Sequence, residues 1–250
     1  MDNTESNHHV DFGFERVCPD EKTRRVQAVF NASADQYDIM NDLMSLGLHY
    51  GWKKKAVEYA HIQPGDTVLD LACGTCDITY YLLKRQQDLT VFATDPNEKM
   101  LNIGRDMLLN HGFFRSIHFS LSYAEGLPYP DDFFQVAICA FGFRNFTNHA
   151  RALAELYRVI RPGGQVIILE FSKPSSHVIQ TGYRAYAQLI PSLGELVAQG
   201  ESNYQYLVDS IEQHMDQAEL SNHLEQAGFL DIRLTELLSG LVCIHRGIKC

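Results

Sequence analysis

The sequence predicts an α/β fold around a doubly wound, seven-stranded, mostly parallel sheet. Short apolar runs alternate along the chain with segments of helical periodicity, which is the pattern of strand–helix–strand units. Some of the runs are apolar at every position, as expected for strands that helices cover on both faces. Two further helical segments, residues 22–60 and 175–215, are not needed to complete the sheet, and we expect them to form a lid over its carboxyl edge.

The strands are predicted where apolar runs are bounded by turn residues. The last two runs flank Leu238–Gly240, and we expect them to form an antiparallel hairpin at the edge of the sheet. In chain order the predicted strands are Thr67–Leu71, Thr90–Thr94, Ile117–Leu121, Phe134–Phe141, Gln165–Phe171, Ile232–Leu237 and Leu241–Arg246.

Four predicted helices alternate with these strands, because their apolar residues are spaced for one helical face. Met100, Leu101 and Leu108 share such a face in the second helix. The third helix is expected to end at a turn over Arg161–Gly164, and the fourth before Gly228, since glycine readily adopts the conformation that terminates a helix. In chain order the predicted helices are Ile78–Arg85, Glu98–Asn110, His149–Ile160 and Gln217–Gln226.

Length and composition indicate one globular domain. The chain has 250 residues, of which 45% are hydrophobic and 21% are charged. We expect this domain to span residues 21–250 and the polar residues 1–20 to be a disordered tail. No basic segment followed by an apolar one opens the chain, and no apolar run approaches the length of a membrane span. We therefore expect a cytoplasmic protein.

Charge and cysteine content restrict the possible partners. A net charge of −10 argues against a nucleic-acid partner, which requires a basic face. The six cysteines are expected to be reduced thiols, because no secretion signal accompanies them. Cys73 and Cys76 form a C-x-x-C pair at a predicted helix start, where a thiolate would be stabilised, so a redox site is an alternative to simple packing. No metal site is expected, because the other cysteines are scattered and form no second pair.

The turn after the first strand carries the strongest functional signal. In Val68–Asp77 (VLDLACGTCD) an apolar run contains Asp70 and continues into small residues around Gly74. The next strand ends in Asp95. Ligands of open α/β sheets bind at the carboxyl ends of the strands, and a carboxylate about 20 residues past such a turn can bind both ribose hydroxyls. An adenosine-containing ligand is therefore the first hypothesis.

Three kinds of adenosine ligand are considered for this turn. A dinucleotide site requires G-x-G-x-x-G and a P-loop requires G-x-x-x-x-G-K-[ST], whereas this turn has only Gly74 and no such lysine. S-adenosylmethionine has no phosphate and carries a cationic sulfonium, which suits a turn with Asp70 beneath it and Asp77 beside it. The alternative is an ordinary strand-to-helix turn in which Asp77 is a first-turn helix acid.

Three other segments resemble one family of enzymes. They are YDIMNDLMS at Tyr37–Ser45, FGFRN at Phe141–Asn145, and RPGG at Arg161–Gly164 leading to LEFSKP at Leu169–Pro174. Together they are similar to segments of the ubiquinone/menaquinone-biosynthesis C-methyltransferases of the UbiE type. The similarity extends over residues 12–247, which is nearly the whole chain.

The resemblance implies a Rossmann-like class I methyltransferase fold with S-adenosylmethionine as cofactor. It implies methylation of a ring carbon on a polyprenylated benzoquinol or a demethylmenaquinol. A lipophilic quinol would be the substrate, other quinone-biosynthesis enzymes would be partners, and the protein would contact the inner membrane face peripherally. Matched by position, Gly74 and Thr75 would lie along the methionine part of the cofactor, Asp95 at the ribose, and Tyr123 and Ala124 at the adenine. Asp70, beneath the turn, is a further candidate for cofactor binding, and the acceptor residues are Tyr37, Arg144 and Asn145.

The chemistry of this reaction explains the acceptor residue types. The ring carbon becomes a nucleophile when the ring hydroxyl loses its proton. We expect a base to take that proton, either a water held by Tyr37 or Asn145 or a nearby histidine. Arg144 would stabilise the phenolate, the alternative being a salt bridge within the fold. His49 and His245 are expected to be structural histidines.

The sequence departs from the family pattern at three positions. Cys76 stands where glycine is frequent, which would narrow the turn and weaken cofactor binding. Tyr123 stands where a small amide or acid is frequent, so stacking would replace a hydrogen bond to the adenine. Ala140 stands where serine is frequent. Two other functions remain open at this point: a methyltransferase with another small-molecule acceptor, and a non-catalytic paralogue within a quinone-synthesis complex.

Overall fold

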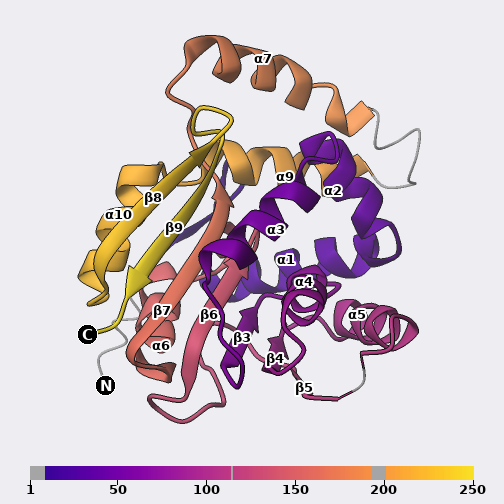
Figure 1. The fold of residues 1–250 in the computed structure, drawn as a ribbon. Helices are drawn as coiled ribbons and strands as arrows, with labels where there is room; N and C mark the ends of the chain where they lie inside the picture. Colours follow the sequence, from indigo (N-terminus) through magenta and orange to yellow (C-terminus); the bar gives the residue numbers. More distant parts are fainter. Residues whose placement is uncertain (1–8, 114, 193–200) are drawn as a thin grey trace, which may run out of the picture.

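The computed structural model describes residues 9–113, 115–192 and 201–250, with the backbone alone for 201–203, and it confirms the predicted seven-stranded sheet (Figure 1). The strand order is β5-β4-β3-β6-β7-β9-β8. Neighbouring strands among β5, β4, β3, β6 and β7 pair in parallel. Strand β9 is antiparallel to both β7 and β8. The strands are β3 (Thr67–Leu71), β4 (Thr90–Thr94), β5 (Ile117–Ser120), β6 (Phe134–Ala140), β7 (Ile160–Phe171), β8 (Leu230–Leu237) and β9 (Val242–Ile248).

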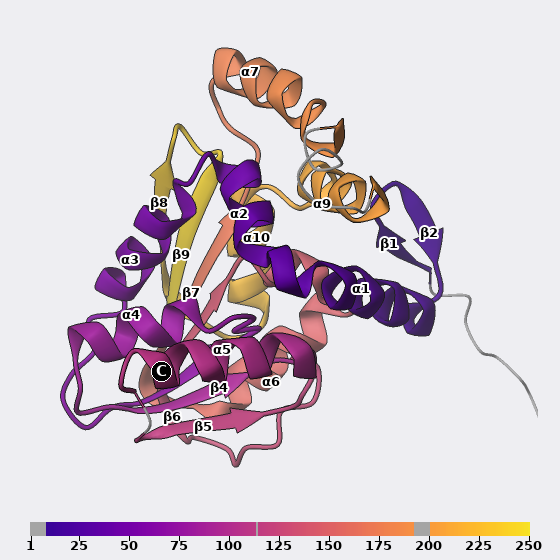
Figure 2. The same ribbon diagram turned by 90° about the vertical axis from the view of Figure 1, so that its right-hand side faces the viewer.

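Helices cover both faces of the sheet, as Figures 1 and 2 show. One layer contains α3 (His49–Tyr59), α4 (Asp77–Arg85) and α5 (Glu98–Asn110). The other contains α6 (His149–Val159) and α10 (Gln217–Gln226). Because β4 and β6 lie on opposite sides of β3, the strand order reverses at β3, and this is where open α/β sheets bind their ligands.

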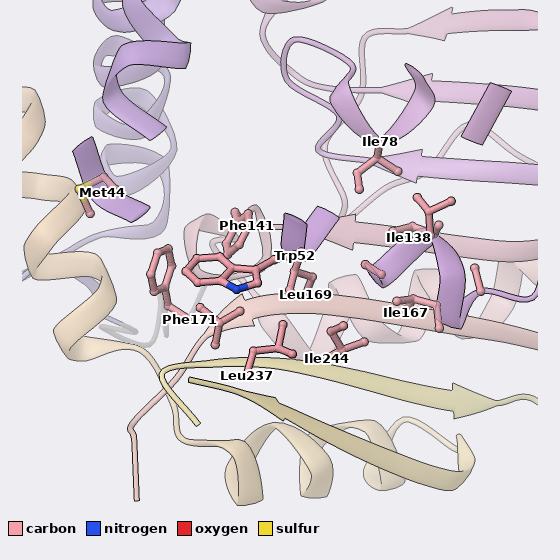
Figure 3. Close-up of a cluster of buried hydrophobic side chains, with 14 of the residues drawn as sticks. Met44, Trp52, Ile78, Ile138, Phe141, Ile167, Leu169, Phe171, Leu237 and Ile244 are labelled. Atoms are coloured by element: carbon pink, nitrogen blue, oxygen red, sulfur yellow. The ribbon is translucent and has the colours of Figure 1, made fainter. Parts of the chain in front are cut away.

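Successive side chains of the central strands supply two separate cores. Val68 and Ile138 pack in the core that includes α3 and α4, whereas Leu69 and Ala137 pack in the core that includes α6 and α10. This alternation follows from the twofold period of a strand. It explains why the central strands are apolar on both faces. Figure 3 shows the first core, where Trp52 of α3 lies beside two phenylalanines at the strand ends.

The two helical segments outside the alternation lie at the carboxyl end of the sheet (Figure 2). Helix α1 packs against α9, and Tyr186 of α7 donates a hydrogen bond to the carbonyl of Leu43 in α2. Within the described residues, no helix is long and apolar enough to cross a membrane. The helices of the two segments at the carboxyl end of the sheet are α1 (Pro19–Ser33), η1 (Ala34–Gln36), α2 (Tyr37–Ser45), α7 (His177–Ala187) and α9 (Glu201–Gln213).

The structure differs from the expected disordered tail over residues 9–20. Strands β1 (Val10–Phe12) and β2 (Glu15–Val17) form an antiparallel hairpin there. The ring of Phe12 stacks on Tyr206 of α9 with centroids 4.3 Å apart, and Val17 is buried. Because Tyr206 is distant from Phe12 in sequence, the polar composition of residues 1–20 did not indicate that the hairpin is ordered. Residues 1–8 of the expected tail, and residues 193–200 of the expected insert, lie outside the described residues.

The expected turn over Arg161–Gly164 is instead the irregular start of β7. Ile160 pairs with Phe134, and regular pairing resumes only at Gln165. Gly163 has φ +77°, and its N–H donates to the carbonyl of Lys249 at 2.7 Å. The segment therefore bends as the sequence suggested, but a hydrogen bond holds it within the sheet.

Candidate active site

One cavity, called the main cavity below because it lies at the predicted ligand edge, opens at the carboxyl ends of β3, β4 and β6, where the strand order reverses. Its sheet side is formed by Ala72 after β3, Asp95 after β4 and Gly142 after β6. Phe30 of α1 and Tyr37 of α2 line the same cavity from the helical side. The predicted ligand edge of the sheet is therefore hollow and is covered by N-terminal helices.

Asp95 joins the two loops that border the cavity. Its carboxylate accepts hydrogen bonds from the N–H of Gly74 at 2.9 Å and from the N–H of Asn97 at 2.8 Å. Burial raises the pKa of Asp95 to about 6, although both N–H donors favour its ionised form. A carboxylate in this position can still accept hydrogen bonds from a vicinal diol, because each oxygen has two lone pairs.

Gly74 leaves space that a side chain would occupy. Its φ is +53°, which favours glycine, and a Cβ built there would lie 3.4 Å from Met100 and 3.7 Å from the ring of Tyr37. The backbone of the turn therefore faces an open cradle between these two side chains. Together with the Asp95 carboxylate, the cradle fits the aminoacyl and ribose parts of an adenosyl sulfonium ligand.

The structure places Asp70 away from the cavity, beneath helix α4. Its carboxylate accepts from the N–H of Thr79 at 3.0 Å and from the Thr79 hydroxyl at 2.6 Å. It thereby satisfies an N–H of the first helical turn, as a capping residue does. Burial raises the pKa of Asp70 to about 7. Asp70 supports the loop that borders the cavity and is not among the residues lining it.

Thr75 and Cys76 pack against helix α5 and do not line the cavity. Cys76 adopts φ +66°, in the left-handed region that favours glycine, which agrees with its glycine-like position. The sulfurs of Cys73 and Cys76 are 3.8 Å apart, and both residues are buried. Burial raises the pKa of Cys73 well above its usual range, so the expected stabilisation of a thiolate by the helix start is wrong for Cys73. This favours packing over redox chemistry.

Tyr123 and Ala124, which were predicted to flank the adenine, line the cavity. Ala124 is buried, whereas the Tyr123 ring is half-exposed at the rim. The phenol ring offers a flat apolar face there. Whether it stacks on the adenine stays a prediction.

Of the residues predicted for the acceptor, Tyr37 and Asn145 line the same cavity as Gly74 and Asp95. The side-chain oxygen of Asn145 accepts a hydrogen bond from the Tyr206 hydroxyl at 2.9 Å, which fixes the orientation of the amide. Burial raises the pKa of Tyr37, opposed by Lys53 and Arg144, so its phenol stays protonated and can act as a hydrogen-bond donor.

Arg144 does not line the main cavity, although its neighbour Asn145 does. Its guanidinium donates to Glu170 at 2.7 Å, to the carbonyl of Phe141 at 2.7 Å and to the Ser210 hydroxyl at 3.3 Å. The side chains of Arg144 and Glu170 are only 7% and 1% exposed. The salt bridge named as the alternative for Arg144 is therefore present, and a stabilising role toward a phenolate stays a prediction.

Sequence reasoning missed two groups of residues at this site. Glu170 is the buried partner of Arg144 and lies in the quoted segment LEFSKP, but its contact is 26 positions away in sequence. Asn41 and His49 line a smaller cavity beside the main one, and Tyr37 lines both. Asn41 lies in the quoted segment YDIMNDLMS and His49 was expected to be a structural histidine, so the sequence indicated both residues but not that they line one cavity.

The fold is that of class I methyltransferases. A crystal structure of a SAM-dependent methyltransferase from Aquifex aeolicus superimposes with a TM-score of 0.61 at 18% identity, covering 94% of this chain and all of that one. At that identity the similarity establishes the fold only.

Sequence comparison establishes the family. The model of the ubiE/COQ5 methyltransferase family matches residues 18–249. The chain is 46% identical over 255 residues to a Coxiella burnetii protein named "Ubiquinone/menaquinone biosynthesis C-methyltransferase UbiE", and the match covers both chains completely. It is 42% identical to the protein of the same name from Hydrogenovibrio crunogenus, over 99% of this chain and 98% of the relative. The chain belongs to the ubiE/COQ5 methyltransferase family, and S-adenosylmethionine is its cofactor.

Proposed function

We propose that the protein transfers a methyl group from S-adenosylmethionine to a ring carbon of a polyprenylated benzoquinol or a demethylmenaquinol. The full-length similarity to proteins named for ubiquinone and menaquinone biosynthesis supports this class of acceptor. The observation that carries the proposal is that one cavity brings Gly74 and Asp95, on the cofactor side, together with Tyr37 and Asn145 on the acceptor side.

Each side of the cavity has a distinct task in this reaction. The bound cofactor supplies an electrophilic methyl group on its sulfonium. Asp95 accepts hydrogen bonds from the ribose, and the Gly74 turn leaves room for the aminoacyl end. The protonated phenol of Tyr37 and the amide of Asn145 hold the acceptor oxygens. Phe30 and Phe141 exclude water and present apolar surfaces to the ring.

We further propose that the helices over the cavity receive the lipophilic acceptor from a membrane surface. Large apolar side chains are exposed on this end of the molecule, on the elements that gather at the top of Figure 1. They include Leu46 after α2, Val178 and Leu189 in and after α7, and Leu238 at the tip of the β8–β9 hairpin. Such a cluster suits peripheral contact rather than insertion.

Methyl transfer to defined acceptors tests this function. The purified protein is incubated with S-adenosylmethionine and, separately, with a prenylated benzoquinol, a demethylmenaquinol and an unprenylated catechol, and the product is identified by mass spectrometry. We expect a methylated product from at least one prenylated quinol and little from the catechol. Methylation of the catechol alone would favour the methyltransferase with another acceptor. Absence of any product together with absence of cofactor binding by calorimetry would favour the non-catalytic paralogue.

A further inference from the structure

A small second cavity lies beside the main one and shares part of its wall. Phe30, Tyr37 and Phe141 line both cavities, while Asn41 and His49 line only the second. The volume of the second cavity is about 10 Å³. This is about the space that one water molecule needs, provided that polar partners surround it.

Two buried polar atoms on the residues lining this cavity have no hydrogen-bond partner among the described residues. They are the side-chain nitrogen of Asn41 and Nδ1 of His49. Leaving a buried polar group unpaired costs about 1–3 kcal/mol, so such groups are rarely without a role. A water in this cavity would lie next to Tyr37 and would be a hydrogen-bond partner for Nδ1 of His49, while the amide of Asn41 lies beside the Tyr37 hydroxyl.

His49 connects this cavity with the solvent. Its Nε2 lies 3.1 Å from a carboxylate oxygen of Asp42, and the side chains of His49 and Asp42 are 3% and 48% exposed. A carboxylate at Nε2 holds the proton on that nitrogen, so Nδ1 keeps a free lone pair. The pair therefore presents a proton acceptor at its buried end and an exposed carboxylate at the other.

The charges around His49 keep the ring neutral. Burial and the ammonium of Lys53 lower the pKa of His49, while Asp42 and Asp77 oppose them. Lys53 of α3 is itself paired with Asp77 of α4 at 2.6 Å, and the ring of Tyr50 lies 3.9 Å from the His49 ring. A neutral imidazole can accept a proton at neutral pH. Neither the protonated phenol of Tyr37 nor a guanidinium bound to Glu170 offers such an acceptor.

We propose that His49, oriented by Asp42, is the base that removes the ring-hydroxyl proton of the acceptor through a water in the second cavity. The inference rests on the proposed function. The hydroxyl O–H bond breaks and its proton passes to Nδ1, and the ring carbon forms a carbon–carbon bond as the sulfonium carbon–sulfur bond breaks. The proton on that carbon then restores the hydroxyl. One proton per turnover reaches the solvent when the imidazolium loses its Nδ1 proton again through the cavity water, while Asp42 keeps the other proton on Nε2, and no oxidant is required.

Two matched histidine variants test this role. Like His49, His245 is buried with an unpartnered Nδ1, and its Nε2 lies 2.9 Å from the carbonyl of Gln217, but it lines neither cavity. With the prenylated quinol, His49→Gln is expected to lower kcat by about 10²-fold or more, which is the usual contribution of general-base catalysis. The cofactor affinity of His49→Gln, measured by calorimetry, should change less than about threefold. For His245→Gln, both kcat and cofactor affinity should change less than about threefold.

An acceptor with an acidified ring hydroxyl separates base catalysis from a structural effect. A halogenated quinol that is already ionised in solution needs no base, so His49→Gln should lower its turnover by less than about threefold. Equal losses with both acceptors would overturn the proposal and leave His49 as a structural residue. If wild-type protein methylates the quinol and His49→Gln does so equally fast, the base is elsewhere and the proposed function stands. If the wild type methylates no quinol, both fail.

Nitrogen-15 NMR of histidine-labelled protein provides a readout that does not depend on turnover. We expect His49 at pH 7 to be neutral, with its proton on Nε2 and none on Nδ1, and Asp42→Asn to change this tautomer preference. A proton on Nδ1, or a doubly protonated ring, at pH 7 would exclude His49 as the acceptor.

Discussion

Two buried aspartates near the ends of neighbouring strands have different surroundings. Asp70 lies at the fourth position of β3 and directs its carboxylate to Thr79 of α4, whereas Asp95 follows β4 and lines the main cavity. Burial raises the pKa of both, to about 7 and about 6. Each is an acidic residue near the end of an apolar run, so sequence alone could not distinguish the carboxylate that supports helix α4 from the one that lines the cavity.

The first prediction concerns the side chain of Asp95. Asp95→Ala should weaken S-adenosylmethionine binding by about 1.5–3 kcal/mol, because it removes hydrogen bonds between the ribose and a charged group. It also removes the two N–H contacts that shape the Gly74 turn. Isothermal titration calorimetry measures the change. An affinity equal to that of the wild type would exclude Asp95 from the ribose site.

The raised pKa of Asp70 predicts that the stability of the protein depends on pH. Its pKa is raised from 3.8 to about 7 in the folded state, so the folded protein binds more protons than the unfolded chain between these pH values. The stability that this group contributes is fully present below pH 3.8 and is lost as the pH rises through about 7. Asp70→Asn keeps a hydrogen-bond acceptor for Thr79 but does not titrate.

Urea unfolding at several pH values checks this prediction. The unfolding free energy of Asp70→Asn should rise relative to that of the wild type as the pH increases from about 4 to 8. The reason is that only the wild type loses, over this range, the stability contributed by a protonated Asp70. A constant difference between the two proteins would show that Asp70 titrates normally.

Arg144 and Glu170 form a buried ion pair, and this changes what a substitution at Arg144 reports. Arg144→Ala leaves the Glu170 carboxylate buried without its cation, which should cost about 3–5 kcal/mol of stability. Arg144→Met combined with Glu170→Gln should recover most of that loss. If the stable double variant also regains turnover, Arg144 acts by ordering the strand end. If turnover stays about 10²-fold low, Arg144 stabilises charge in the reaction.

Among the helices and turns, helix α5 packs closely against the Cys76 turn that follows Gly74. A Cβ on Gly104 would lie 2.5 Å from the Cys76 sulfur and 2.9 Å from the backbone carbon of Thr75. Only a glycine therefore allows α5 to approach the turn this closely. The cysteine sulfur fills the remaining space and is fully buried.

Gly104→Ala should accordingly displace the turn and lower both stability and cofactor affinity, the latter by about tenfold, equivalent to about 1.4 kcal/mol. Gly182→Ala in α7 is the matched control, because nothing lies within 4 Å of the position that a Cβ would take there, and alanine favours a helix. Thermal unfolding and calorimetry compare the two. Equal behaviour of both variants would mean that the contact between α5 and the turn does not control the site.

For the whole molecule, the sequence predicted the sheet well because its strands are continuous apolar runs between turn residues. The N-terminal hairpin was missed because its stability comes from Tyr206, almost two hundred positions beyond Phe12. The site was predicted in part. Gly74, Asp95 and Asn145 line the cavity because the carboxyl ends of parallel strands meet at one edge. The burial of Arg144 with Glu170 depends on a contact between distant segments, which no local pattern records. The pairing of His49 with Asp42, seven positions away, depends on the turn between α2 and α3.

In the proposed reaction, the methyl group of S-adenosylmethionine is transferred to a ring carbon of a quinol bound in the same cavity. The most direct test supplies S-adenosylmethionine labelled with carbon-13 in its methyl group, together with a prenylated quinol, and examines the product by NMR. We predict a labelled methyl bound to a ring carbon, whose carbon-13 signal couples to the neighbouring ring carbons. A labelled methyl bound to a ring oxygen, or label that remains in the donor while both ligands are bound, would contradict the account.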